Sequence, residues 1–370
     1  MRAKPQTVVA KIGTSSITDA KGHVDEGAVR RLCTEVAALR GDGHRVVIVT
    51  SGAITAGLPA IGLDGERRPT DTLTLQAVSA IGQSRLMRVY DRLLGDHGLV
   101  GAQVLLAPLD FVHRSQYLHA RQTLDRLLEL GAVPVINEND AIADDEIRFG
   151  DNDRLAALVA HLVRADVLVL LTDTPGLFTA DPRLDASASL IEEIVEVDHE
   201  LERSAGRSGS DRGSGGMASK LAAAKIAAWS GVRAVIAGAD RPGVLRAAVA
   251  GEPGVGTVVR PHDRRLTARK LWIAFAIGAR GTVVVDDGAR RALLERDASL
   301  LPAGVVDVTG SFDADDAVEI AGTDGRVFAK GLVRHPAAVV KEWRGRRTTD
   351  LPADLPHEVV HRDDLVVLPA

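Results

Sequence analysis

Residues 1 to about 260 alternate between two kinds of segment, and this alternation constrains the fold more than any other feature of the sequence. Short runs rich in β-branched apolar residues occur at 8–12, 46–50, 100–106, 133–136, 167–172 and 234–237. Longer stretches with helical spacing lie between them, at 26–40, 72–94, 115–130, 154–163 and 217–230. Strands that alternate with helices predict an α/β domain with a mainly parallel central sheet.

The predicted strands are apolar on both faces, as strands are when helices cover both sides of a sheet. We therefore predict an αβα sandwich. In such sheets ligands bind at the carboxyl ends of the strands, so the residues that directly follow each strand are the candidates for function.

The pattern changes after a Gly-Glu-Pro-Gly turn at 251–254 and a polar run at 260–270. Short strand-like runs then occur at 281–286, 304–309, 317–320 and 327–329, with one helix at 289–296. This spacing is typical of a small, mostly β domain. We predict the α/β domain over 1–262, a linker over 263–275, the β domain over 276–358 and a C-terminal tail over 359–370.

Composition excludes several classes of protein. The net charge of −5 gives no electrostatic footprint for nucleic acid. Cys33 is the only cysteine, which excludes disulfide frameworks and multi-cysteine zinc sites. The N-terminus lacks the apolar run of a signal peptide, and no stretch reaches the roughly 18 apolar residues of a membrane span. We expect a cytoplasmic protein that does not associate with membranes.

Small and charged residues follow the first two predicted strands. Lys11 and Gly13 supply a cation and a backbone that an anion can approach closely, although such residues also form ordinary strand–helix turns. Ser51 and Gly52 follow the second strand, where small residues either let a ligand lie against main-chain N–H groups or serve the close packing of a helix on the sheet.

Polar side chains follow the fourth and fifth predicted strands. The run 137–140 (Asn-Glu-Asn-Asp) comes directly after an apolar strand, and such groups are solvated or bind a ligand, because burying them unpaired is costly. Asp or Asn at 151–153 caps the next helix, but capping explains only one of the three residues. Thr172 and Asp173 end the fifth strand, where a nucleotide can lie; turn formation explains most of the segment that follows.

A glycine-rich loop at 213–220 (Gly-Ser-Gly-Gly-Met-Ala-Ser-Lys) leads into a predicted helix. Backbone N–H groups at a helix N-terminus form an anion site. The loop matches neither the Walker A motif nor the dinucleotide fingerprint. It therefore indicates phosphate without identifying the nucleotide.

Seven strings occur in a fixed order within residues 6–230: VVAKIGTSS, VIVTSGAITAG, GQSRLM, PVINENDAI, FGDNDRLAALVA, LLTDTPGLFTADPR and SGGMASKLAAAKIA. Together they resemble the amino acid kinase family, and within it the enzymes that phosphorylate the side-chain carboxylate of L-glutamate with ATP. This resemblance implies an acyl phosphate product that opens proline biosynthesis. The C-terminal part, from DDGARRALLERDASLLPAGVVDVTGSF through VHRDDLVVL, looks like a PUA domain.

The resemblance assigns roles residue by residue. Lys11 matches the family's phosphate-binding lysine, Lys220 the lysine that follows its glycine loop, and Asp153 the aspartate that orients both. The residues that match substrate-binding positions are Ser51, Asp140, Asn152 and Asn137. The residues expected at the ATP site are Lys11, Gly13, Gly52, Thr172, Asp173, Ser214, Gly215, Gly216, Met217, Ala218, Ser219 and Lys220.

The resemblance also implies partners. These are ATP with Mg²⁺, L-glutamate, proline as an inhibitor at the glutamate pocket, and further copies of the chain in a homo-oligomer. A carboxylate nucleophile with a pKa of about 4.3 is ionised at neutral pH, so no general base is needed. Catalysis then rests on cations, N–H groups and Mg²⁺ at the transferred phosphoryl group. The sequence does not indicate which residues hold the metal, because phosphate and water supply most Mg²⁺ ligands.

Two alternatives stay open. One is another kinase of the family, acting on aspartate, N-acetylglutamate, carbamate or UMP. The other is a non-catalytic RNA-binding protein with a kinase-like fold, because PUA domains commonly bind RNA. Residues 271–370 carry 16 acidic residues against 12 Lys and Arg, a balance that neutralises phosphates poorly, so we do not expect RNA as a partner.

Overall fold

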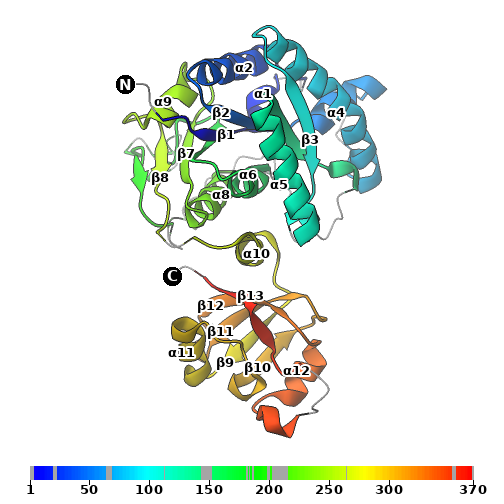
Figure 1. The fold of residues 1–370 in the computed structure, drawn as a ribbon, viewed down its shortest axis with the longest axis vertical. Helices are drawn as coiled ribbons and strands as arrows, with labels where there is room; N and C mark the ends of the chain where they lie inside the picture. The colour runs from blue at the N-terminus through cyan, green and yellow to red at the C-terminus, as the bar shows by residue number, and fades with distance from the viewer. Residues whose placement is uncertain are drawn as a thin grey trace. The chain divides into compact units, whose positions relative to one another are not determined.

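A computed structural model of the chain divides into two compact units, Met1–Arg265 and Leu266–Ala370, which are considered separately (Figure 1). The structure describes residues 4–19, 23–63, 69–111, 113–142, 152–180, 182, 184–185, 187–197, 201, 216–263, 265–351 and 356–368.

The first unit is built on an eight-stranded sheet. Its strands are β1 (Thr7–Ile12), β2 (Arg45–Val49), β3 (Gly101–Leu106), β4 (Val133–Glu138), β5 (Val167–Thr172), β6 (Glu193–Ile194), β7 (Arg233–Gly238) and β8 (Thr257–Val259). They lie in the order β3-β4-β2-β1-β5-β7-β8-β6. All neighbouring pairs are parallel except β7 and β8, which confirms the prediction of a mainly parallel sheet.

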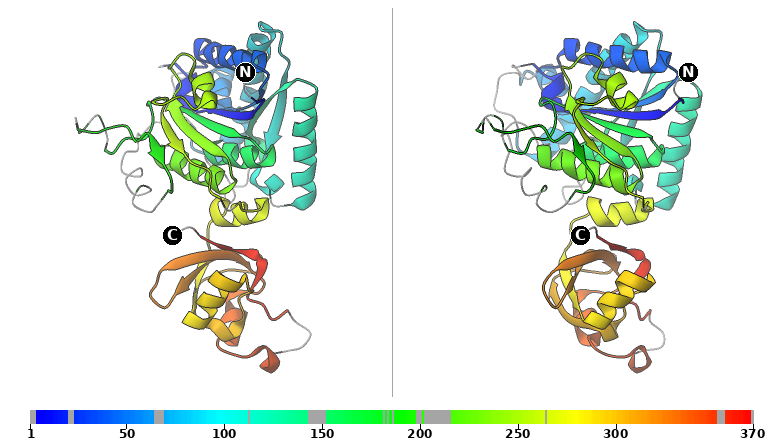
Figure 2. Two further views of the ribbon diagram at one scale, coloured as in Figure 1. Left: turned by 60° about the vertical axis from the view of Figure 1, so that its left-hand side comes forward. Right: turned by 90° about the vertical axis from the view of Figure 1, so that its left-hand side faces the viewer.

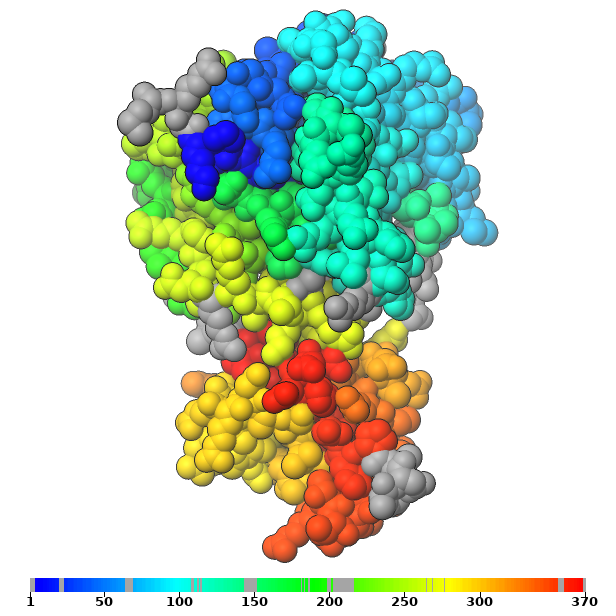
Figure 3. Space-filling model, viewed as in Figure 1, coloured from blue at the N-terminus to red at the C-terminus, as the bar shows by residue number. Residues whose placement is uncertain are grey.

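Helices cover both faces of this sheet (Figures 1 and 2). The helices are α1 (Thr14–Ile17), α2 (Glu26–Gly41), α3 (Ala53–Gly57), α4 (Thr72–Gly95), α5 (Arg114–Glu129), α6 (Asn152–Leu162), α8 (Met217–Trp229) and α9 (Val244–Ala250). Helices α2, α4 and α9 share a core with one face of the sheet, while α6 and α8 pack together on the other face. Helix α5 packs against β4 and leaves its outer side at the surface (Figure 3).

Burial explains why these segments form strands and helices. Every residue of β1, β4 and β5 is buried, as expected for strands covered on both faces. The side chain of Asp25 accepts hydrogen bonds from two backbone N–H groups at the start of α2, and the side chain of Asp71 accepts one, from Thr74, at the start of α4. Such caps fix where each helix begins, and therefore where the loop before it ends.

The second unit is a five-stranded sheet in the order β10-β9-β11-β12-β13. The strands are β9 (Gly281–Val285), β10 (Val305–Gly310), β11 (Ala317–Gly322), β12 (Val327–Val333) and β13 (Val360–Val367). Helices α11 (Asp287–Arg296) and α12 (Ala337–Trp343) contribute Leu293 and Val340 to its core. A short helix α10 (Ala268–Leu271) and a π-helical turn at Trp272–Ala276 precede the sheet.

Two predicted boundaries are corrected. Residues 359–370 were expected as a tail, but Val360–Val367 form β13, which pairs antiparallel with β12. The predicted linker at 263–275 is also wrong in part, because Leu271, Trp272 and Ile273 are buried and the π-helical turn contacts β12 and β13. The two errors have different causes: charged residues interrupt the apolar period of β13, whereas the apolar run at 271–273 follows a polar stretch and is buried only by partners that are distant in sequence.

Several short elements of the first unit were not predicted from the sequence; they include the strands β6 and β8 and the helices α1, α3 and α9. The strands have only two and three residues, too few for a period to be visible. Among the helices that the structure describes, none combines the length and apolar character that crossing a membrane requires.

Candidate active site

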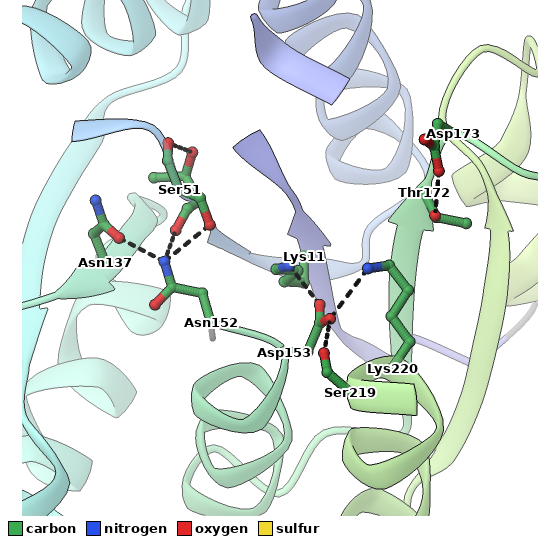
Figure 4. Close-up of polar contacts among 10 residues, drawn as sticks. Lys11, Ser51, Asn137, Asn152, Asp153, Thr172, Asp173, Ser219 and Lys220 are labelled. Atoms are coloured by element: carbon green, nitrogen blue, oxygen red, sulfur yellow. Dashed lines mark hydrogen bonds and ion pairs between the residues drawn. The ribbon is translucent and has the colours of Figure 1, made fainter. Parts of the chain in front are cut away.

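Three charged side chains from separate elements meet at the carboxyl edge of the sheet in the first unit (Figure 4). Lys11 lies near the end of β1, Asp153 in the first turn of α6 and Lys220 in the first turn of α8. Lys11 Nζ forms an ion pair with Asp153 Oδ1, and Lys220 Nζ lies 3.2 Å from Asp153 Oδ2. All three side chains are buried, so one carboxylate holds two ammonium groups at one place. We call these three residues the charged cluster.

The charge state of Asp153 follows from its neighbours. Burial alone would raise the pKa of this carboxyl group, but the charges of Lys11 and Lys220 lower it below its ordinary value. Ser219 adds to this effect, because its hydroxyl donates to Asp153 Oδ2 at 2.7 Å. The carboxylate is therefore ionised at neutral pH, and the charged cluster carries one net positive charge, which suits an anionic ligand.

Three polar side chains meet beside the charged cluster (Figure 4). Asn152 Nδ2 lies within hydrogen-bond distance of three oxygens: Thr50 O at 2.8 Å, Ser51 Oγ at 2.9 Å and Asn137 Oδ1 at 2.8 Å. Asn152 is the first residue of α6, Ser51 follows β2, and Asn137 lies in β4. We call Ser51, Asn137 and Asn152 the amide cluster. Because Asn152 and Asp153 are consecutive, the start of α6 contributes to both clusters.

One buried atom of the amide cluster has no partner within the described ranges of the chain. The side-chain oxygen of Asn152, Oδ1, is buried and finds no donor among the described residues. A buried acceptor without a donor is destabilising, and such groups in native proteins are usually satisfied by water or a ligand. The position therefore suits a ligand that brings an N–H group.

The order of the strands sets the layout of the site. Asn137, Ser51, Lys11 and Thr172 come from β4, β2, β1 and β5 or the residues that follow them, and these four strands are neighbours in that order. Figure 4 accordingly shows the amide cluster on one side of the two lysines and the Thr172–Asp173 pair on the other. Thr172 Oγ1 donates to Asp173 Oδ1 at 3.0 Å. A ligand lying along this edge would meet amides, then cations, then a hydroxyl and a carboxylate.

Glycines open the backbone around the charged cluster. Gly52 precedes α3 with φ +93°, a conformation that side chains rarely adopt. Gly13 follows Lys11, and a Cβ added there would lie 3.5 Å from Lys11 Nζ. A side chain at 13 would therefore touch the ammonium group without a clash.

The structure describes most of the remaining predicted site residues, but not all of them. Gly216 directly precedes α8, whose first turn contains Met217, Ala218, Ser219 and Lys220. Ser214 and Gly215 lie outside the described residues. Asp140 begins a short 3₁₀ turn and accepts a hydrogen bond from Ser79 Oγ of α4 at 2.8 Å. A direct role of Asp140 in binding substrate stays a prediction.

Metal binding by the protein alone receives no support from these side chains. Within the part of the chain that the structure describes, no group of three or more His, Cys, Asp or Glu residues is arranged to hold an ion. Asp153, the carboxylate nearest to the two lysines, is already engaged by both. That phosphate oxygens and water supply most ligands of a divalent metal here stays a prediction.

Two buried side chains near the amide cluster were not singled out from the sequence. Tyr90 OH lies 2.8 Å from Thr50 Oγ1, and Gln83 Oε1 accepts from Asn137 Nδ2 at 3.4 Å. Both come from α4 and line a small cavity that Thr50 and Asn137 also line. Gln83 belongs to the quoted string GQSRLM, and Tyr90 is one of 2 tyrosines in a chain with 3% aromatic residues. Only this scarcity could have drawn attention to Tyr90.

Comparison with known proteins agrees with the fold. Residues 6–238 match the model of the amino acid kinase family, and residues 281–353 match that of the PUA domain. The chain belongs to the amino acid kinase family and carries a PUA domain. Its N-terminal unit is therefore the kinase unit.

Curated relatives align over nearly the full length. The chain is 43% identical to a glutamate 5-kinase of Pelobacter propionicus, covering 99% of this chain and 98% of that protein. It is 45% identical to a glutamate 5-kinase of Geobacter sp. (strain M21), with the same coverage of both. A solved structure, carbamate kinase from Giardia lamblia bound to AMP-PNP, is more distant, with 16% identity and a TM-score of 0.49 over 69% of this chain and 98% of that chain.

Proposed function

We propose that this protein transfers the γ-phosphoryl group of ATP to the side-chain carboxylate of L-glutamate, giving L-glutamate 5-phosphate for proline biosynthesis. The observation that carries the proposal is the charged cluster, in which Asp153 holds Lys11 and Lys220 at one buried place. Relatives of 43–45% identity that are named glutamate 5-kinases support the choice of acceptor.

In the proposed reaction an oxygen of the glutamate side-chain carboxylate attacks the γ-phosphorus of ATP. A new O–P bond forms, the bond to the β-phosphate bridging oxygen breaks, and ADP leaves with that electron pair. The carboxylate is already ionised near neutral pH, so no proton has to be removed. The obstacle is repulsion between the anionic acceptor and the triphosphate. Lys11 and Lys220 oppose this repulsion, because preorganised cations stabilise the charge that develops on the transferred phosphoryl oxygens.

The two ends of the site have separate tasks in this proposal. The amide cluster and Asp140 bind glutamate, with Asn152 Oδ1 accepting from the substrate ammonium group. Thr172, Asp173 and the start of α8 bind ATP, with Gly13 and Gly52 offering backbone N–H groups. The strand order supports this assignment, because it places the lysines between the two ends, where the phosphoryl group would be transferred.

Mg²⁺ is proposed to enter with ATP. Phosphate oxygens and water would hold it, because the described side chains form no metal cage. The ion would neutralise part of the phosphate charge beside the two lysines.

Three finer expectations belong to the proposal. Proline is proposed to inhibit at the glutamate pocket, so added proline should raise the glutamate concentration needed for half-maximal rate; an unchanged saturation curve would contradict this.

The chain is proposed to form a homo-oligomer, which light scattering would reveal as a mass above 39.1 kDa, whereas a mass equal to that value would contradict it. The reaction is proposed to take place in the cytoplasm.

One experiment tests the function directly. The protein is incubated with ATP, Mg²⁺, hydroxylamine and one candidate acid at a time, because hydroxylamine attacks an acyl phosphate, releases phosphate and leaves a hydroxamate. We expect γ-glutamyl hydroxamate with L-glutamate. Product only with aspartate or N-acetylglutamate would replace glutamate by another acceptor. No turnover, together with tight RNA binding, would favour the non-catalytic alternative.

A further inference from the structure

The segment Thr50–Gly52 decides the position of the amide cluster. Two of the three oxygens near Asn152 Nδ2 belong to this segment: the carbonyl of Thr50 at 2.8 Å and the hydroxyl of Ser51 at 2.9 Å. A shift of the segment would therefore move Ser51 and break both contacts to Asn152 at once. What holds Thr50 in place is consequently important for substrate binding.

Two further contacts tie Thr50 to other elements, beside a hydrogen bond within the segment that its hydroxyl donates to the carbonyl of Ser51 at 3.2 Å. The backbone N–H of Thr50 donates to the carbonyl of Ile136 in β4 at 2.8 Å, which fixes the end of β2 against its neighbouring strand. Its side-chain hydroxyl lies 2.8 Å from Tyr90 OH, in a hydrogen bond in which either oxygen can donate. The second contact ties the turn after β2 to α4, an element that is not part of the sheet.

Tyr90 is buried on every side, with 0% of its surface exposed. It therefore lies out of reach of any substrate and acts only through its neighbours. Burial raises the pKa of its phenol, so the hydroxyl stays protonated at all physiological pH values. A buried phenol needs a hydrogen-bond partner, and Thr50 is the partner that the described structure provides.

Helix α4, which carries Tyr90, also fixes the far end of the turn at Gly52. Helix α3 begins directly after Gly52 and packs on α4 with almost no space between the backbones. A Cβ added at Gly82 would lie 1.7 Å from the carbonyl oxygen of Ala53, and one added at Gly57 would lie 2.1 Å from that of Val78. Gly82 and Tyr90 are eight residues apart, so they share one face of α4. This face of α4 therefore contacts the chain on both sides of Gly52, at Thr50 before it and at Ala53 after it.

We propose that Tyr90 is a positioning residue for the acceptor-binding end of the site: its hydroxyl fixes Thr50, and through Thr50 it fixes Ser51 and Asn152. The inference rests on the proposed function, because it takes the amide cluster to bind glutamate. It predicts that loss of this hydroxyl weakens binding of the acceptor and leaves ATP binding unchanged, since the charged cluster and the Thr172–Asp173 pair have no contact with Tyr90 among those the structure gives.

The test compares Tyr90→Phe with Tyr117→Phe in the full chain. Tyr117 is the other tyrosine; it lies on α5, so the control repeats the chemical change away from the site. We expect Tyr90→Phe to raise KM for glutamate about fivefold or more, the effect of losing one buried hydrogen bond, with KM for ATP within about twofold of wild type. Tyr117→Phe should change neither value.

Two further variants separate positioning from general destabilisation. Thr50→Val removes the other hydroxyl and should raise KM for glutamate as Tyr90→Phe does, while the double variant should be no worse than either single variant. Thr50→Ser keeps a hydroxyl and should restore most of the affinity. Equal increases in both KM values, or additive effects in the double variant, would overturn the inference.

A second readout does not depend on the identity of the acceptor. Hydrogen exchange of the backbone amides in 50–57 should be about threefold faster or more in Tyr90→Phe than in wild type, because the turn loses its tie to α4. If wild type fails to phosphorylate glutamate, the proposed function falls, and this exchange still decides whether Tyr90 fixes the turn. If wild type is active but neither KM for glutamate nor the exchange rate changes, only the role of Tyr90 falls.

Discussion

The two halves of the candidate site are built from opposite kinds of interaction. In the charged cluster, formal charges are buried and compensate one another: Asp153 lies between two ammonium groups, and its pKa falls. In the amide cluster the groups are neutral and are held by hydrogen bonds, and one buried acceptor finds no donor in the part of the chain that the structure describes. In the proposed function the charged cluster stabilises the transferred charge and the amide cluster binds the acceptor.

The contrast also concerns how each half is held in place. The charged residues lie on or directly beside the sheet: Lys11 is in β1 itself, and Asp153 begins a helix that packs on β1. The amide cluster depends in addition on a turn that α4 fixes from outside the sheet. Substitutions in the first half should therefore remove chemistry, whereas substitutions in the second should mainly weaken binding.

The largest effect is expected from Lys220→Ala. This variant removes one of the two cations that the proposal places at the transferred phosphoryl group, and kcat should fall by about 10²–10³-fold or more. Rates under saturating ATP and glutamate measure the effect. Lys341→Ala, an exposed lysine of the second unit, is the control and should retain wild-type kcat. A kcat within a factor of about three of wild type for Lys220→Ala would remove this lysine from catalysis.

The next largest effect is expected from Asp153→Asn. Without the carboxylate, two buried ammonium groups face each other uncompensated, and the free energy of unfolding should fall by about 3–5 kcal/mol. Urea unfolding at neutral pH measures this value.

The free energies of unfolding of wild type and Asp153→Asn can also be compared as a function of pH. The folded-state pKa of Asp153 lies below its unfolded value of about 3.9, so its stabilising contribution is complete above that value and is lost as pH falls through the folded pKa. The difference in stability between wild type and Asp153→Asn should therefore be constant from pH 8 to about pH 5 and shrink below about pH 4. A difference that instead grows in acid would contradict the ionised carboxylate.

A smaller and more selective effect is expected from Asn152→Ala in the amide cluster. KM for glutamate should rise about tenfold or more, because the amide contacts three oxygens and offers the free acceptor to the substrate, while KM for ATP should change little. Gln122→Ala, an exposed amide on α5, is the control. A change confined to KM for ATP would mean that the two halves have exchanged roles.

The smallest of these effects is expected from Gly82→Ala. The added Cβ would collide with the carbonyl oxygen of Ala53 at 1.7 Å, and because this neighbour is backbone, α3 has to move. We expect a loss of about 1–3 kcal/mol in stability together with a higher KM for glutamate. Gly95→Ala in the same helix has open space around the new Cβ and should be neutral or slightly stabilising. Equal behaviour of the two variants would show that α4 does not fix the turn.

Much of the kinase unit could be predicted from the sequence, because its strands and helices have strong and different periods. The six predicted strands correspond to β1, β2, β3, β4, β5 and β7, and the boundaries of α2 and α4 differ by at most one residue from the structure. The second unit was harder. Strand β13 carries the charged residues Arg362, Asp363 and Asp364, so its apolar period is interrupted, and only pairing with β12 reveals it as a strand.

The candidate site was predictable where its residues lie at the ends of strands or directly after them. Lys11, Ser51 and Asn137 could be selected because parallel strands end at one edge of the sheet. Tyr90 and Gln83 could not, because a buried tyrosine or glutamine in an amphipathic helix looks like any other residue of the core face. Their relation to the site depends on two side chains meeting across 40 and 54 positions of sequence.

The sequence by itself determined the class of fold and the chemical types present at the strand ends, because local periodicity and the order of the segments contain that information. The resemblance already implied that Asp153 orients both lysines, and the structure gives those contacts. Only the tertiary structure decided that α4 approaches α3 closely enough to fix the turn at Gly52. Such facts depend on distances between segments remote in the chain, and those distances are set by packing of the whole unit rather than by any local pattern.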